Sequence, residues 1–271
     1  DLEWTYIDEN SVWGNVLNTS GTGTTPAILA PMFRNNATRV TISRQQYDIS
    51  LVHSSKYLLI RIRSVAYSGN DRIEQPWSYE VNSGGSVVSG VIILNNTWHE
   101  PGLNWQYSAS YSEEGKKKEV VSYFDGTLRN RQSVTVSQMG IVGGTDKYKV
   151  VQENIYDEFG RKAASVLPAP MAGEQLAYET GATKTATGAA YTYANVYKGN
   201  SASCFTIPDP LGNTAGAGKY YSSANSFLAE ASFNKYIPDA EGYPLAITAY
   251  TPDNTGRVSL QGGVGPTFQP N

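Results

Sequence analysis

Apolar and polar residues alternate along several short stretches of the first hundred positions, and this pattern predicts β-strands. Residues 57–65, YLLIRIRSV, place aliphatic side chains on one face and both Arg61 and Arg63 on the other. This is typical of a half-buried strand whose basic residues point outward. Similar stretches are RVTIS at 39–43, VVSGVIIL at 87–94 and NWQYSASY at 104–111.

Clusters of Gly, Ser, Asn and Thr separate these stretches and predict turns, at residues 18–26, 67–72 and 82–86. Short strands at this spacing predict a β-sandwich. We therefore expect an all-β protein, with one sandwich domain over residues 1–105 and a second β-region over residues 106–271. Helix signals are weak throughout, and SSANSFLAEASF at 222–233 predicts one short helical turn at most.

The composition limits the classes of partner. The chain has 21 Lys plus Arg and 24 Asp plus Glu, so its charge favours neither nucleic acid nor an anionic membrane surface. No apolar run approaches the roughly 18 residues of a membrane helix, and we expect no membrane insertion. The sole cysteine, Cys204, excludes an internal disulfide. The opening DLEWTYID reads as the middle of a strand, so we expect a part of a longer polypeptide.

Four short stretches of the second β-region share an aspartate and a glycine, and three of them continue with an arginine. In three of the four, the glycine comes three residues after the aspartate; in the first, it follows directly. The candidate turn residues are Tyr123, Asp125, Gly126 and Arg129 in the first stretch, Tyr156, Asp157, Gly160 and Arg161 in the second, Asp239 and Gly242 in the third, and Asp253, Gly256 and Arg257 in the fourth.

Elementary physical chemistry gives this spacing a meaning. An aspartate at the start of a tight connection can accept hydrogen bonds from the backbone N–H groups that follow it. A glycine near the end supplies the positive φ that other residues resist. The arginine begins the return strand and can reach back to the aspartate. The pattern therefore predicts hairpin turns, and the aspartates and arginines are expected to build those turns.

These residues resemble the tyrosine–aspartate repeats of the RHS (rearrangement hotspot, or YD-repeat) family, above all the large RHS-repeat-associated proteins of the Bacteroidetes. The resemblance extends over most of the chain and includes LNWQYSASYSEEGKKKEVVSYFDGTLRNRQSVT at 103–135, YDEFGRKAASVLPAP at 156–170 and YIPDAEGYPLAITAYTPDNTGRVSLQGGVGPTFQ at 236–269. It implies a fibronectin-like sandwich followed by irregular repeat hairpins of a strand spiral. In relatives this spiral winds into a hollow shell that can enclose a toxic C-terminal domain.

The resemblance also implies partners and a location. The partners would be the remainder of the same polypeptide and its C-terminal cargo, together with secretion-system or envelope proteins. The location would be secreted, or associated with the outer membrane or cell surface of a Gram-negative bacterium.

No stretch carries a catalytic signature. His53 and His99 lie in different segments, and neither a G-x-S-x-G elbow nor a phosphate-binding or dinucleotide-binding loop is present. Residues 207–213, IPDPLGN, resemble the Asp-Pro-x-Gly motif near the end of RHS cores, but they lie in mid-chain, so we expect Asp209 to build a turn. We therefore expect no enzyme activity, no cofactor and no metal site.

The leading hypothesis is a non-catalytic structural section of a large RHS-repeat protein, contributing to a β-shell, its plug or an external platform that encloses or delivers a C-terminal toxin. An alternative is a β-sandwich adhesion module that binds carbohydrate or protein through exposed Trp13, Trp98 and Trp105. A third hypothesis, a polysaccharide hydrolase, requires two carboxylates roughly 5 to 9.5 Å apart in a groove.

Overall fold

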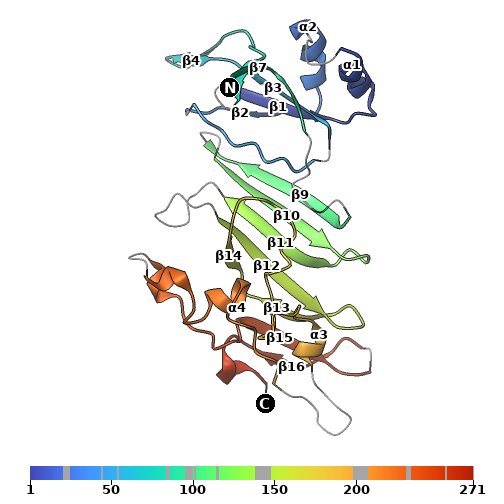
Figure 1. Cartoon of the computed structure of the whole chain (residues 1–271), viewed down its shortest axis with the longest axis vertical. Helices are drawn as coiled ribbons and strands as arrows, with labels where there is room; N and C mark the ends of the chain where they lie inside the picture. The colour runs from blue at the N-terminus through green and yellow to red at the C-terminus, as the bar shows by residue number, and fades with distance from the viewer. Residues whose placement is uncertain are drawn as a thin grey trace. The chain divides into compact units, whose positions relative to one another are not determined.

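The structure is a computed structural model that describes residues 1–20, 25–43, 45–53, 55–83, 86–94, 100, 102–113, 116–137, 148–197, 207–229, 233–253 and 255–270. It is an all-β protein of antiparallel sheets with a few short helices between strands (Figure 1). The chain divides into two compact units, Asp1–Pro101 with Ser110–Lys117, and Gly102–Ala109 with Lys118–Asn271. The sequence placed the boundary at residue 105, and the sheet of the second unit begins at Asn104.

The first unit is built on a four-stranded antiparallel sheet with the order β2-β1-β3-β8. These strands are β1 (Leu2–Ile7), β2 (Thr38–Val40), β3 (Tyr57–Ile62) and β8 (Val91–Ile93). Two separate hairpins pair β4 (Val65–Ser68) with β5 (Asp71–Glu74), and β6 (Glu80–Ser83) with β7 (Ser86–Ser89).

A helical layer covers one face of this sheet, which the sequence did not predict. It contains α1 (Val12–Ser20), α2 (Pro26–Leu29) and the 3-10 helix η1 (Ala30–Phe33). Helix α1 begins where the hydroxyl of Ser11 accepts the N–H of Gly14 at 3.0 Å. A side chain at Gly14 would meet the carbonyl oxygen of Asp8, so glycine permits this close approach.

Apolar side chains bury both faces of the sheet. On the helical side the buried cluster is Ile7, Leu17, Leu29, Met32, Phe33, Tyr57, Leu59 and Val91. On the other side Leu2, Trp4, Val40, Leu58 and Ile60 pack against partly buried residues of the irregular chain between 42 and 51. The other sheets described in this unit are the two-stranded pairs β4–β5 and β6–β7, so the finer expectation of a fibronectin-like sandwich is not confirmed.

An eight-stranded antiparallel sheet, which lies in the second unit except for the ends of β9 and β10, has the order β16-β15-β13-β12-β11-β10-β9, and β14 pairs with β12 (Figure 1). The strands are β9 (Asn104–Tyr111), β10 (Lys117–Phe124), β11 (Asn130–Ser137), β12 (Tyr148–Tyr156), β13 (Lys162–Val166), β14 (Ala169–Ala172), β15 (Leu245–Tyr250) and β16 (Val258–Gly262). Consecutive hairpins, rather than crossovers, connect most of these neighbours, because short turns join antiparallel strands.

The long connection between β14 and β15 packs against the sheet. It includes α3 (Tyr193–Val196), α4 (Gly216–Tyr220) and the 3-10 helices η3 (Ser226–Ala229) and η4 (Phe233–Tyr236), while η5 (Pro266–Phe268) follows β16. The buried cluster between the connection and the strands is Ile155, Ala163, Ala164, Val166, Ala169, Tyr191, Val196, Leu211, Ala217, Leu245 and Ile247. The predicted helical turn within 222–233 corresponds to η3.

A buried polar bridge also fastens this connection to the sheet. Gln132 on β11 is fully buried, and its amide donates to the carbonyl of Glu179 at 3.0 Å while accepting the N–H of Glu179 at 2.7 Å. Lys149 on β12, also buried, donates to the carbonyl of Gln175 at 2.9 Å. These bonds satisfy polar groups that would otherwise be costly to bury.

Candidate functional site: three hairpin turns

Three hairpin connections of the second unit carry the repeated residues. They join β10 to β11, β12 to β13, and β15 to β16, and in each the pairing shifts by a bulge at its last pair. The last pairs are Phe124 with Asn130, Tyr156 with Lys162, and Tyr250 with Val258. The repeated aromatic position is therefore held by Phe124 in the first hairpin.

The sequence assigned that position to Tyr123, and this was wrong. Tyr123 is buried on β10, where its hydroxyl donates to the carbonyl of Leu176 at 2.5 Å and its ring meets that of Tyr178 edge-on. Successive residues of a strand face opposite sides, so Tyr123 and Phe124 cannot share a role. Tyr123 instead helps to hold the long connection to the sheet.

The first turn is organised by Asp125. One carboxylate oxygen accepts the N–H groups of Thr127 at 2.9 Å and Arg129 at 3.1 Å, and the other accepts the Nε of Arg129 at 2.8 Å. The backbone closes the same loop, since Asp125 N–H donates to the carbonyl of Arg129 at 3.0 Å and Leu128 N–H donates to the carbonyl of Asp125 at 2.9 Å.

The second turn repeats these bonds one for one around Asp157. Its carboxylate accepts the N–H groups of Phe159 at 3.0 Å and Arg161 at 2.8 Å, and the Nε of Arg161 at 2.8 Å. Asp157 N–H donates to the carbonyl of Arg161, and Gly160 N–H to the carbonyl of Asp157. The two turns thus have the same length and the same hydrogen-bond pattern.

This equivalence corrects the interpretation of Gly126. The sequence suggested a contracted first turn in which Gly126 plays the part of Gly160. In the structure Leu128 occupies the place of Gly160, with a φ of 61° against 79°, and Gly126 has no positive φ. A leucine in the left-handed region is uncommon and strained, and no sequence pattern indicated it.

The third turn, around Asp253, is two residues longer. Thr251, which follows the aromatic Tyr250, donates its N–H to the carbonyl of Arg257 at 2.9 Å. The carboxylate of Asp253 accepts the hydroxyls of Thr251 and Thr255 and pairs with the guanidinium of Arg257. Gly256, with a φ of 73°, supplies the left-handed position.

The remaining predicted turn, with Asp239 and Gly242, does not join two paired strands. It lies between η4 and β15, and it has no following arginine. The carboxylate of Asp239 does accept the N–H of Glu241 at 2.7 Å, and Gly242 has a φ of 87°. The carboxylate of Asp239 also accepts the N–H of Ser223 at 3.1 Å, so this turn forms without a hairpin and is fastened to the long connection.

Hydrogen bonds hold two of these aspartates in their charged form. Partial desolvation acts to raise the pKa of Asp125, but the hydroxyl of Thr127, the N–H groups of Arg129 and Thr127 and the guanidinium of Arg129 together hold this pKa well below its usual range. The hydroxyls of Thr251 and Thr255, followed by Arg257, lower the pKa of Asp253 in the same way.

An arginine from each of the first two turns stacks on a tyrosine of the next hairpin. The guanidinium of Arg129 lies 5.2 Å from the ring centre of Tyr156, and that of Arg161 lies 4.5 Å from the ring centre of Tyr250. The strand register explains both contacts, because continuing the pairs Gln132–Glu153 and Ala164–Ile247 by three positions sets each arginine opposite its tyrosine. Cation–π contacts therefore link the turns across the sheet.

The tyrosine hydroxyls repeat as well. Tyr156 donates to the carbonyl of Asn130 at 2.9 Å, and Tyr250 donates to the carbonyl of Lys162 at 3.1 Å. Asn130 and Lys162 each directly follow the arginine on which the tyrosine stacks. We call this unit, an arginine under a tyrosine ring with the tyrosine hydroxyl on the next carbonyl, the Arg–Tyr clasp.

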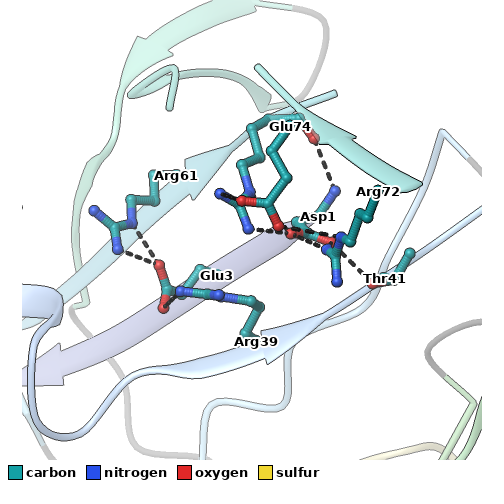
Figure 2. A network of polar contacts seen from close by, with 8 residues as sticks. Asp1, Glu3, Arg39, Thr41, Arg61, Arg72 and Glu74 are labelled. Atoms are coloured by element: carbon teal, nitrogen blue, oxygen red, sulfur yellow. Dashed lines mark hydrogen bonds and ion pairs between the residues drawn. The ribbon is translucent and has the colours of Figure 1, made fainter. Parts of the chain in front are cut away.

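A second polar cluster lies on the sheet of the first unit (Figure 2). Glu3 on β1 is paired across the sheet with Arg39 and Arg61, and the side chain of Glu3 is 5% exposed. The carboxylate of Asp1 forms ion pairs with Arg63 and Arg72, and the side chain of Asp1 is fully buried. The expectation that Arg61 and Arg63 point outward was wrong, because the carboxylates of Glu3 and Asp1 compensate their charges.

Trp77 covers this cluster, with the guanidinium groups of Arg61 and Arg63 each 4.4 Å from a ring centre. Every charged side chain of the cluster is paired with an opposite charge inside the unit. The arrangement therefore stabilises the sheet and does not present an unpaired charge to a ligand.

Of the candidate reactive residues, the structure describes His53, which packs on the ring of Tyr6 at 4.6 Å between ring centres. His99 and Cys204, like Trp98 of the alternative platform, lie outside the described residues. Within the described part of the chain, no group of His, Cys, Asp and Glu could hold a metal ion. No helix in that part has the length and apolar character to cross a bilayer.

Asp209 and the alternative aromatic platform can also be placed. The carboxylate of Asp209 accepts the amide of Asn195 at 3.1 Å, and its carbonyl accepts the hydroxyl of Tyr191 at 2.6 Å. Its segment is therefore held in the long connection. Of the tryptophans proposed for a binding face, Trp13 on α1 is 38% exposed. Trp105 on β9 is half-buried and interacts with other residues of the protein.

Comparison with known proteins gives one result. No curated protein and no solved structure matches the chain. Residues 97–207, which include the first two hairpin turns and the strands β9 to β14, match the model of a family described as a domain of unknown function, DUF6443.

Proposed function

We propose that this chain is a non-catalytic structural section of a large secreted or cell-surface RHS-repeat protein. In this role it contributes to a β-shell, or to its plug or platform, that encloses or delivers a C-terminal toxin. Its partners are then the rest of the same polypeptide and the cargo, with secretion-system or envelope proteins at the surface of a Gram-negative cell.

The observation that carries this proposal is the Arg–Tyr clasp, which occurs at two successive junctions with the same parts in the same places. A catalytic site needs each of its residues once, whereas a contact that links neighbouring hairpins is expected at every junction between them. Each aspartate is used within its own turn by its own arginine. The recurring residues therefore stabilise the turns and join neighbouring hairpins, as a wall built from repeated strands requires.

The experiment is a double-mutant cycle on the chain's unfolding free energy. Arg161→Ala and Tyr250→Ala are made singly and together, with Arg34→Ala as the control for loss of an exposed arginine. We expect each single change at the clasp to destabilise the chain by about 1 kcal/mol or more and the pair to be non-additive. Unchanged stability in both clasp variants would contradict a structural role.

A second experiment tests whether this chain forms part of an enclosing shell. The complete polypeptide that contains this chain is purified with and without the double substitution and exposed to limited proteolysis. We expect the substituted protein to be cut faster within residues 102–271 and in the downstream polypeptide, since an open wall admits protease. Equal resistance of both proteins would argue against an enclosing shell.

A further inference from the structure

The last strand of the sheet, β16, has one open edge. It pairs with β15 on one side, and no described strand pairs with its other side. Val258, Ser259 and Gln261 are exposed, with Val258 at 50%. An open edge leaves a row of backbone donors and acceptors that a further strand can bind.

Two strand pairs in the sheet, β11–β12 and β13–β15, show which side chain an added strand places beside the turn arginine. At β11–β12 and at β13–β15, the incoming strand places a tyrosine opposite the arginine that ends the preceding turn. The same tyrosine donates its hydroxyl to the carbonyl of the residue after that arginine. Both junctions are antiparallel, so the rule fixes direction, register and side chain together.

At β16 the accepting half of the clasp is present. Arg257 ends the third turn, as Arg129 and Arg161 end the first two, and it is held by Asp253 and by the hydroxyl of Thr255 at 3.0 Å. Its side chain is 71% exposed, against 32% for Arg129 and 21% for Arg161, each of which stacks on a tyrosine of the next hairpin.

The geometry points to β16 as the acceptor of a further antiparallel strand of the same tyrosine–aspartate class, with a tyrosine opposite Arg257. The ring of this tyrosine lies over the guanidinium of Arg257, and its hydroxyl donates to the carbonyl of Val258. This inference rests on the proposed structural function and names the partner of its open edge. A second copy that pairs through its own β16, VSLQG, fits poorly, because that strand has no aromatic residue.

The test uses the 271-residue chain and a fluorescent peptide with the sequence of residues 148–162, YKVVQENIYDEFGRK. This strand already fits an Arg–Tyr clasp in the protein through its Tyr156. Binding is followed by fluorescence anisotropy, and amide hydrogen exchange locates the bound peptide. We expect saturable binding and slower exchange confined to residues 258–262.

Substitutions on each side examine the clasp. We expect binding to weaken about tenfold with Arg257→Ala in the protein, or with Tyr156→Ala in the peptide, through loss of the cation–π contact. Tyr156→Phe in the peptide, which keeps the ring and loses the hydroxyl, should give an intermediate loss. The protein control Arg34→Ala, an exposed arginine of the first unit, should bind as the unsubstituted chain does.

Several outcomes overturn the inference. They are no binding up to about 1 mM peptide, equal binding by Arg257→Ala, equal binding of the Tyr156→Ala peptide, or protection at a strand other than β16. Self-association of the chain that blocks the peptide would assign the edge to a second copy instead. If the inference fails while the Arg161–Tyr250 cycle shows coupling, the structural function stands without this edge role; if that cycle also shows none, both fail.

Discussion

Leu128 occupies in the first hairpin turn the position that Gly160 occupies in the second, and both residues have positive φ angles, 61° and 79°. The bonds from the backbone N–H groups to Asp125 and to Asp157 agree one for one, so the turn imposes this conformation whatever the residue. Leu128 is 74% exposed, so little packing offsets its strain.

We therefore expect Leu128→Gly to stabilise the chain by about 1 kcal/mol, since glycine adopts this conformation without the clash that leucine suffers. Chemical denaturation measures the difference. Leu128→Ala, which shortens the side chain but keeps the β-carbon, serves as the control and should give no comparable gain. Equal or lower stability of Leu128→Gly would show that the leucine side chain contributes more than its exposure indicates.

Gly160 and Gly256 form a matched pair for a second prediction. Both have positive φ, but a β-carbon at Gly160 would lie 1.8 Å from Nη1 of Arg129, whereas one at Gly256 would meet nothing within 4 Å. We expect Gly256→Ala to cost about 1 kcal/mol from backbone strain alone, and Gly160→Ala to cost more because Arg129 must also leave Tyr156.

Adding Arg129→Ala separates the two contributions. In that background the cost of Gly160→Ala should fall toward the cost of Gly256→Ala, as thermal or chemical unfolding would show. If the two glycine substitutions cost the same in the unsubstituted chain, Arg129 moves aside freely and the contact between the first two turns is weak.

Glu153 on β12 should make stability depend on pH. Burial raises the pKa of this carboxyl, and hydrogen bonds from Gln132 and Tyr178 do not offset it. Between the ordinary pKa of 4.5 and the raised value, the folded chain binds more protons than the unfolded chain. The stabilisation by the neutral carboxyl is therefore complete below pH 4.5 and is lost as the pH rises through the raised pKa.

Glu153→Gln cannot ionise, so we expect it to remove this loss. Its unfolding free energy, relative to that of the unsubstituted chain, should improve as the pH rises from about 4 to about 8. The exposed Glu158→Gln is the control and should leave the profile unchanged. Parallel profiles for Glu153→Gln and the unsubstituted chain would show that folding does not change the pKa of Glu153.

The first unit offers a test of the buried ion pairs. Glu3 is 5% exposed and Arg61 is 11% exposed, so Glu3→Ala leaves a nearly buried arginine without its carboxylate. We expect a loss of about 3 kcal/mol or more. The exposed pair of Lys56 and Glu9 provides the contrast, and Glu9→Ala should cost about 0 to 1 kcal/mol in the same unfolding measurement.

A cost for Glu3→Ala as small as that for Glu9→Ala would mean that water reaches Arg61 after the carboxylate is removed. The strands β1 and β3 would then be held mainly by their apolar clusters, of which Leu59 and Trp4 are members.

The sequence by itself determined the features that depend on a few neighbouring residues. The all-β class followed from alternating residues, and the turns around Asp157 and Asp253 followed from their spacing, because each carboxylate bonds within four residues. The same local argument wrongly gave Gly126 the left-handed position of the first turn. Leu128 holds that position, and a leucine in the sequence does not indicate a positive φ.

Only the tertiary structure decided which residues from distant parts of the chain contact one another. Arg161 meets Tyr250 across 89 positions of the chain, and Arg61 meets Glu3 across 58. Such contacts depend on strand register and on the order of strands in a sheet, which local patterns do not specify. The helical layer over the first sheet arose for the same reason, because burial of its apolar residues is a property of the assembled core and not of the segment alone.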